Sequence, residues 1–173
     1  MKNLFLTIAA MMFLVSASAQ SNLTGRWQSQ KITEDTEQLA VEFFFKDSVN
    51  MEMSFVTENR MPNIGFCLSR VTVQGTYCFV GPLFFPTVDN NTVSVKIEKL
   101  ELDEALTNKT TPTMRKDFEK MLEKQMLETA VPLFENLDGS YLLYVSHEGT
   151  EDSFTFILGD ENDAIELVMD RIK

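Results

Sequence analysis

Residues 92–102 read Thr92-Val93-Ser94-Val95-Lys96-Ile97-Glu98-Lys99-Leu100-Glu101-Leu102. In an extended chain the apolar Val93, Val95 and Ile97 would all face one way, because successive side chains of a strand point to opposite faces. The polar residues between them would face the other way. This alternation predicts a strand with one buried face and one face in water, which is typical of antiparallel sheets.

Further strands are predicted on both sides of this stretch, from alternation or from short apolar runs rich in β-branched and aromatic residues. One run contains Gly75 and is predicted to be two strands or one strongly bent strand. The runs after residue 140 are separated by short polar connections that contain glycine, which suits hairpins. The predicted strands cover residues 25–30, 38–45, 48–56, 64–80, 140–146, 153–158 and 164–172.

A helix is predicted between the two groups of strands. Thr111 can cap its start and Pro112 suits its first position. Pro132 is expected to kink the helix or to end it near Val131. Charged residues fill one face, so we expect a surface helix lying on the sheet or over one end of it. The apolar residues that recur at helical spacing are Met114, Phe118, Met121, Leu122 and Met126.

These elements predict a mainly β fold in one domain, residues 20–173, with no repeat. It would have eight or nine antiparallel strands and one inserted α-helix. Closure of the sheet into a single β-barrel is the economical way to remove exposed strand edges.

Residues 1–19 have the pattern of a secretory signal peptide. Lys2 precedes a short apolar run over residues 4–15, and Ala17-Ser18-Ala19 offers small residues for cleavage. The run is shorter than the roughly 20 residues that span a bilayer. We therefore expect a periplasmic or secreted protein with no integral membrane segment after cleavage.

The full chain has a formal net charge of −11. An acidic surface repels nucleic acid, so we expect no nucleic-acid partner. Export also removes access to cytoplasmic ATP and NAD, which argues against most common enzyme classes.

Cys67 and Cys78 are the two cysteines. An oxidising compartment favours a disulfide. However, a turn at Gln74-Gly75 would pair Val71 with Cys78 and leave Cys67 out of register. Two alternatives stay open, a disulfide across a bent strand or two buried free thiols.

The segment Leu23-Thr24-Gly25-Arg26-Trp27 contains the only tryptophan. A glycine two residues before a tryptophan in the first strand resembles the Gly-x-Trp signature of lipocalins and the wider calycin superfamily. Residues 71–77, with Gly75 and Tyr77, are similar to a strand of lipocalin-like domains in exported Bacteroidetes proteins. The resemblance implies a lipocalin-like barrel whose closed end is plugged by Trp27, a structural role. In one departure, the helix here precedes three more strands, whereas a typical lipocalin has its helix after the eighth strand.

The aromatic residues are more numerous than a minimal core needs. With the ten methionines, they have two interpretations: they line an adaptable apolar cavity, or they pack together and fill the interior. We slightly favour a filled or mostly filled interior. If a cavity exists, the candidate ligand-binding residues are Phe43, Phe45, Phe55, Phe79, Phe84, Phe85, Tyr144 and Phe156.

The segment Gly81-Pro82-Leu83-Phe84-Phe85-Pro86 places apolar residues in a loop-like context. It is interpreted either as an exposed rim, which would put Phe84 and Phe85 near a cavity mouth or at a partner contact, or as a loop folded over the barrel end.

Catalytic patterns are scarce. His147 is the only histidine and lies in a predicted turn, and the neighbouring Ser146 would point to the opposite face of its strand. Residues 160–163 lack the spacing of a calcium loop. We expect no enzyme, no metal and no cofactor.

The leading functional hypothesis is non-catalytic binding of a small apolar or amphipathic ligand. The alternative is a protein–protein interaction module, an inhibitor or envelope partner with a filled barrel. Its contact surface would be residues 81–86 together with the helix over residues 112–137.

Overall fold

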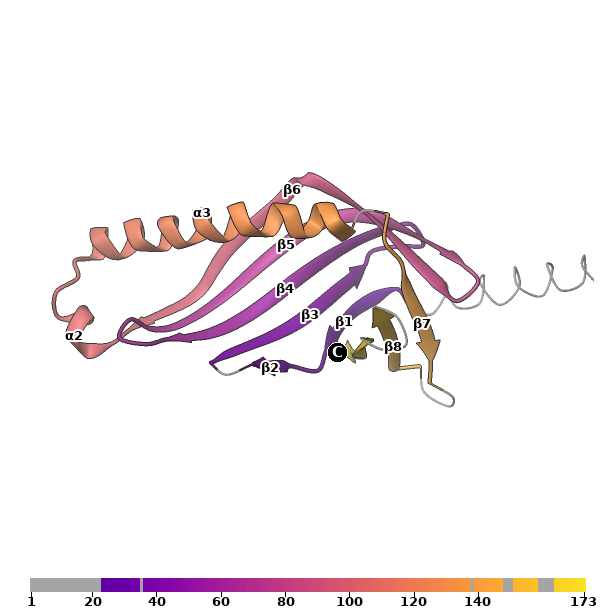
Figure 1. Ribbon diagram of the computed structural model, residues 1–173, viewed down its shortest axis with the longest axis horizontal. Helices are drawn as coiled ribbons and strands as arrows, with labels where there is room; N and C mark the ends of the chain where they lie inside the picture. The colour runs from indigo at the N-terminus through magenta and orange to yellow at the C-terminus, as the bar shows by residue number, and fades with distance from the viewer. Residues whose placement is uncertain (1–22, 35, 138, 148–150, 159–163) are drawn as a thin grey trace, which may run out of the picture.

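The computed structural model describes residues 23–34, 36–137, 139–147, 151–158 and 164–173. The predicted signal segment and the acidic turn at residues 160–163 lie outside this part. The mainly β fold and its antiparallel pairing are confirmed (Figure 1). The strands are β1 (Gly25–Ser29), β2 (Ile32–Glu34), β3 (Glu37–Phe45), β4 (Asn50–Met61), β5 (Gly65–Val80), β6 (Leu83–Leu102), β7 (Leu142–Ser146), β8 (Ser153–Leu158) and β9 (Ile165–Ile172); the helices are α2 (Glu104–Thr107) and α3 (Pro112–Leu137).

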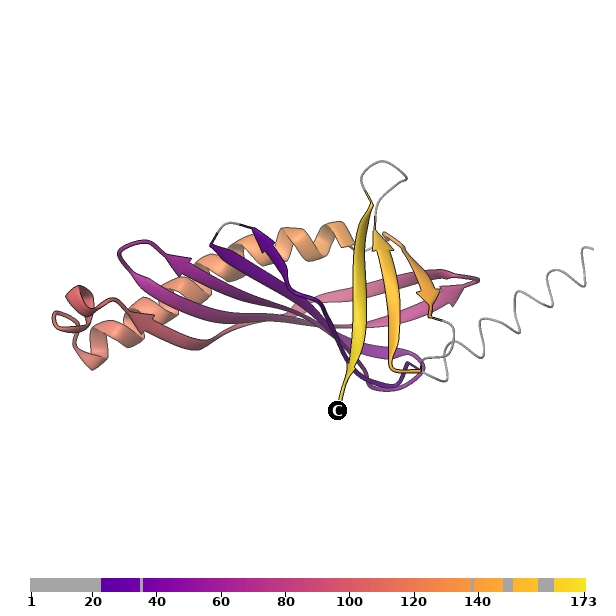
Figure 2. The same ribbon diagram turned by 90° about the horizontal axis from the view of Figure 1, so that it is seen from below.

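The nine strands form one ring-like sheet. Their order is β1-β9-β8-β7-β6-β5-β4-β3-β2, and β1 also pairs with β3, which brings the two ends of the order together. All pairings are antiparallel, and β7, β8 and β9 follow α3 in the chain, as the sequence predicts. Figure 2 shows β8 and β9 side by side, crossing the long strands at an angle. Two short elements, β2 and α2, were not predicted.

The stretch around Gly75 forms one strand, with no turn at Gln74-Gly75. β5 pairs with β6 along its whole length, with register irregularities at Leu68/Ser69 and Thr72/Gln74. A Cβ at Gly75 would lie 2.2 Å from the Thr87 carbonyl oxygen, so glycine lets the two backbones approach closely.

The expected loop over residues 81–86 is mostly strand. Only the turn at Gly81 and Pro82 interrupts the pairing, and β6 begins at Leu83. Phe84 is fully buried and Pro86 is buried, so these two residues form no exposed rim. Proline is tolerated here because β6 pairs with β7 only at Leu83 and Phe84 and is an edge strand beyond them.

Helix α3 starts as predicted and continues through Pro132. The Thr111 hydroxyl accepts a hydrogen bond from the Met114 amide at 3.2 Å, which caps the start. Of the two expected effects of Pro132, an end near Val131 does not occur, because the helix ends at Leu137. Burial of Phe134, whose side chain has no exposed surface, offsets the hydrogen bond that proline cannot donate.

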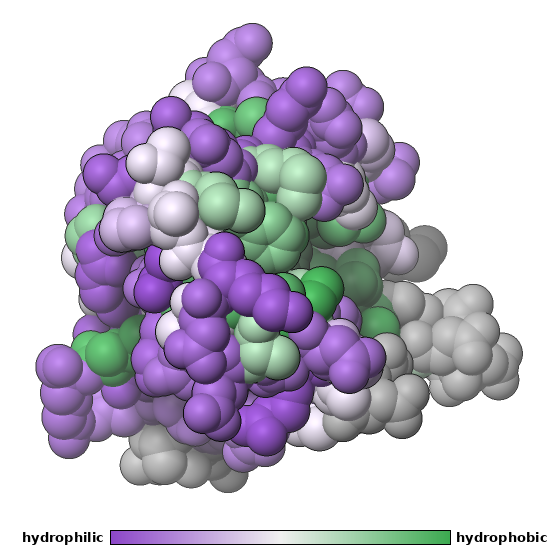
Figure 3. All heavy atoms as spheres, turned by 90° about the vertical axis from the view of Figure 1, so that its left-hand side faces the viewer, coloured by the Kyte–Doolittle hydropathy of each residue, from purple (hydrophilic) through white to green (hydrophobic). Residues whose placement is uncertain are grey.

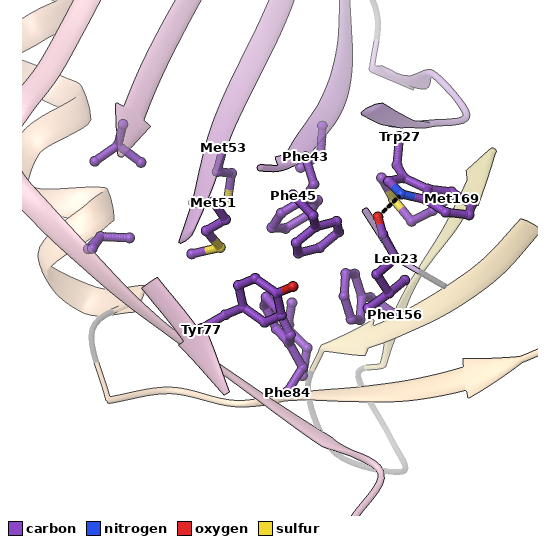
Figure 4. Close-up of a cluster of buried hydrophobic side chains, with 14 of the residues drawn as sticks. Leu23, Trp27, Phe43, Phe45, Met51, Met53, Tyr77, Phe84, Phe156 and Met169 are labelled. Carbon is purple, nitrogen blue, oxygen red and sulfur yellow. Dashed lines mark hydrogen bonds between the residues drawn. The ribbon is translucent and has the colours of Figure 1, made fainter. Parts of the chain in front are cut away.

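The core is an aromatic cluster inside one end of the ring (Figure 4). The Phe84 ring lies 5.9 Å from Phe43 and 4.7 Å from Phe156 between ring centroids. Trp27 is buried beside them, and its indole N–H donates to the Leu23 carbonyl at 2.6 Å. The interior at this end is therefore filled by side chains.

The two cysteines are free thiols. They lie on the same strand, β5, where Cys67 is buried and Cys78 is exposed. Odd-numbered and even-numbered residues of a strand face opposite ways, so the two thiols point to opposite faces of the sheet. Burial, and to a lesser extent the Glu119 carboxylate, raises the pKa of the Cys67 thiol.

Candidate functional site

An apolar groove lies between α3 and strands β3, β4 and β5. Its volume is about 620 Å³, within the roughly 300–1,000 Å³ of small-molecule sites. Eight of its twelve lining residues are apolar. The lining residues are Glu37, Leu39, Phe55, Thr57, Val71, Gln125, Met126, Thr129, Ala130, Leu133, Phe134 and Leu137.

The position of α3 leaves this groove open. The helix packs mainly against β6 and also touches β5, so it leaves part of the same sheet face uncovered on β3 and β4. Phe55 is paired with Val41 of β3 on one side and with Val71 of β5 on the other, and Leu39 is paired with Thr57. Because paired residues share a face, these side chains form a continuous floor.

Two rows of side chains on α3 form the wall of the groove. Met126, Ala130 and Phe134 form the inner row, because residues four apart lie on one face of a helix. The Phe134 ring lies 5.4 Å from the ring of Phe55 in the floor. Leu133 belongs to the outer row and is 56% exposed, so it borders the solvent-facing opening.

The groove changes from polar to apolar along its length. Glu123 of α3 contacts the backbone of Ile97 in β6. Across the sheet, Ile97 is level with Ser69 of β5 and then with Thr57 of β4. Further along α3, Phe134 reaches Phe55. Gln125 therefore lies toward the Thr57 end of the floor, whereas Phe134 lies toward the aromatic core.

The polar end of the groove carries a single carboxylate. Glu37 is exposed at the start of β3, and its carboxylate accepts a hydrogen bond from the side-chain amide of Asn59, its partner on β4. Figure 3 views the molecule from the end that carries α2 and shows hydrophobic residues at the centre of a mostly hydrophilic surface.

Most of the eight predicted ligand-binding residues come together in the aromatic core, and only one of them lines the groove. Phe55 lines the groove. Phe43, Phe45, Phe84 and Phe156 are exposed by 2% or less and pack in the core.

The remaining residues of that set differ in position. Phe79 and Tyr144 are half-buried against the core. The centroid of the Phe85 ring lies 5.9 Å from that of Tyr141, with the two ring planes tilted by 48°, on the opposite face of the strand from Phe84. Sequence reasoning missed the rest of the groove lining, although Met126 belonged to the predicted apolar face of the helix.

A second, smaller hollow of about 310 Å³ lies on the opposite face of the same strands. Its lining is mainly polar and charged, and one of its residues, Glu58, pairs with Lys31 at 2.5 Å. The lining residues are Thr36, Gln38, Glu58, Arg60 and Phe66.

His147 lies between two hydroxyl groups and does not line the groove. Its Nδ1 is 3.1 Å from the Ser153 hydroxyl and its Nε2 is 2.9 Å from the Thr155 hydroxyl. The side chain is half-buried. No group of three or more potential metal-ligating residues occurs within the described residues.

No family model matches the chain, and no curated protein or solved structure matches it at a significant level. Among the helices of the described residues, none is both long and apolar enough to cross a membrane.

Proposed function

We propose that this chain is an exported, non-catalytic binding protein for a small apolar or amphipathic ligand. In this proposal the ring of strands is a lipocalin-like barrel, and the ligand binds in the groove between α3 and the barrel wall. The supporting observation is the groove itself: about 620 Å³ of space lined mostly by apolar side chains and reachable from solvent beside Leu133.

The apolar lining can supply enough binding energy without a charged anchor. Burial of apolar surface contributes about 25 cal/mol per Å². A ligand that buries about 300 Å² would gain about 7.5 kcal/mol before the cost of immobilising it. The Met126 side chain can adapt to different ligand shapes because it is unbranched and flexible.

Displacement of an uncharged naphthylamine dye tests this proposal. The dye brightens in apolar surroundings, and dodecyl maltoside below its micelle concentration would compete for the same groove. Leu133→Glu should weaken dye binding about tenfold or more, because a carboxylate resists transfer to an apolar site.

Leu127→Glu provides the matched control. Leu127 lies on the same helix and is 36% exposed, but it does not line the groove. The Leu127→Glu variant should bind the dye as the unmodified protein does. Equal weakening in both variants, or no dye binding in the unmodified protein, would contradict a ligand site in this groove.

The alternative, a protein-interaction module, is supported by a different observation. Met114 and Met121 are 54% and 49% exposed on α3, while the aromatic end of the ring is filled. Native mass spectrometry of the purified protein separates the two functions. A bound small molecule supports the ligand binder, whereas a second protein chain supports the interaction module.

A further inference from the structure

We infer that the groove selects single-chain amphiphiles with a cationic head group and discriminates against free acids. This inference rests on the proposed ligand-binding function and specifies the chemistry of the ligand. The tail would lie against Phe55 and Phe134, and the head group would lie at the polar end beside Glu37.

The charges at the groove carry the inference. Among its lining residues, all of which belong to the described part of the chain, Glu37 is the one charged side chain. A carboxylate head group would meet this negative charge without a cationic partner in the lining. An ammonium head group would form an ion pair with it, and the net charge of −11 acts in the same direction at longer range.

The surroundings of Glu37 hold its carboxylate in place. The Asn59 amide donates to Glu37 Oε1, and the two residues are direct partners across β3 and β4. Leu39 follows Glu37 on the same face of β3 and begins the apolar part of the floor. A head group beside Glu37 therefore allows the attached chain to continue along the floor.

Gln125 and Thr57 complete the polar end. Both line the groove and offer uncharged oxygen atoms that can accept hydrogen bonds from an ammonium group. The opposite end offers Leu137 and Phe134, which cannot satisfy a charged group. The gradient therefore gives the amphiphile one orientation.

Competition between three probes with the same dodecyl chain tests the inference. The probes are dodecylammonium, dodecyl maltoside and dodecanoate, each below its micelle concentration, competing with the uncharged dye. Dodecylammonium should bind about tenfold more tightly than dodecanoate at low salt, and the difference should shrink as salt screens the exposed carboxylate.

Two variants separate the local effect of Glu37 from the effect of the total charge. Glu37→Gln should bring the affinities of the cation and the anion close together, and it should change the affinity of the uncharged maltoside the least. Glu128→Gln removes the same charge from an exposed position on α3 outside the groove, and should keep most of the preference.

Each outcome has a separate meaning. If dodecanoate binds as tightly as dodecylammonium, or if both variants reduce the preference equally, the assignment to Glu37 is wrong while the groove can still be a ligand site. If none of the three probes, the maltoside included, displaces the dye, the proposed function itself fails.

Discussion

Tyr77 places a phenol in the most apolar part of the molecule. Its side chain is 4% exposed, and its ring lies 4.9 Å from Phe45 and 5.6 Å from Phe84 between centroids. The hydroxyl donates a hydrogen bond to the Asp47 carbonyl at 2.7 Å. The buried polar group is therefore satisfied only in its protonated form, since the phenolate has no proton to donate.

Because of this environment, the stability of the folded state should fall at alkaline pH. Burial, with a smaller effect from the Asp47 carboxylate, raises the pKa of Tyr77 from 10 to about 12. The folded state holds this proton more tightly than the unfolded state does. The stabilisation of the folded state by the protonated Tyr77 is therefore complete below about pH 10, and it is lost as the pH rises from about 10 to about 12. One pKa unit corresponds to about 1.4 kcal/mol, so the free energy of unfolding should fall by about 2–3 kcal/mol over this range.

Tyr77→Phe should remove this part of the pH dependence. Urea titrations at several pH values from about 9 to about 12 cover the range in which tyrosine loses its proton. Over this range the free energy of unfolding should fall less steeply for the variant than for the unmodified protein. Burial also raises the pKa of Tyr144, so some slope should remain. Tyr141→Phe is the control, because Tyr141 is 57% exposed. Identical slopes for Tyr77→Phe and the unmodified protein would rule out this role.

At the scale of elements, α3 protects the free edge of β6. β6 pairs with β7 at only two positions, and the rest of that edge would expose unpaired backbone groups to other strands. Glu123 accepts a hydrogen bond from the Ile97 amide at 3.2 Å, and the Arg115 guanidinium donates to the Leu100 carbonyl. Two helix side chains thus occupy backbone groups that a neighbouring strand would otherwise use.

Glu123→Ala should destabilise the protein by about 1 kcal/mol, because it leaves a half-buried amide without its acceptor. Urea unfolding measures this loss, and hydrogen exchange should show faster exchange of the Ile97 amide. Glu128→Ala changes an exposed residue whose ion pair with Lys124 spans 3.8 Å, so it should cost almost nothing. Equal losses in the two variants would show that the contact with Ile97 is not stabilising.

The sequence predicted most elements because their local patterns agree with their packing. The strand over residues 153–158 has the predicted bounds, and Val95 and Ile97 lie in one strand as their alternation indicates. The errors occur where tertiary contacts override a local signal. Pro86 indicates a loop, yet the free edge of β6 accommodates it. Pro132 predicts either a kink or a helix end, and the end does not occur, because the burial of Phe134 stabilises the helix beyond it.

At the scale of the whole molecule, the groove could not be predicted because it depends on where α3 lies on the sheet. The apolar pattern of the helix shows that one face is buried but not which strands it covers. Phe43 and Phe55 look alike in sequence, both being aromatic residues in predicted strands. They differ in the structure because Phe43 lies at the filled end of the ring, whereas Phe55 lies under the edge of the helix.

The strength of pairing also varies around the ring, and this variation predicts where it opens first. Between β4 and β5 twelve residue pairs are in register, and between β8 and β9 there are six. Between β6 and β7 there are two, at Leu83 and Phe84, extended by one hydrogen bond from the Tyr144 amide to the Pro82 carbonyl at 2.8 Å. Local opening needs less free energy where fewer backbone hydrogen bonds must break.

Hydrogen–deuterium exchange followed by mass spectrometry should therefore find a seam between β6 and β7. Peptides that cover residues 142–146 should exchange faster than peptides that cover residues 50–61 or 165–172. The strands of the β8–β9 hairpin serve as the control, because they follow β7 in the chain but are paired more extensively. Dodecyl maltoside in the groove should slow exchange in α3 and leave the seam unchanged, because the groove lining includes no residue of β6 or β7. Slower exchange in residues 142–146 than in residues 50–61 would mean that the ring opens at another place.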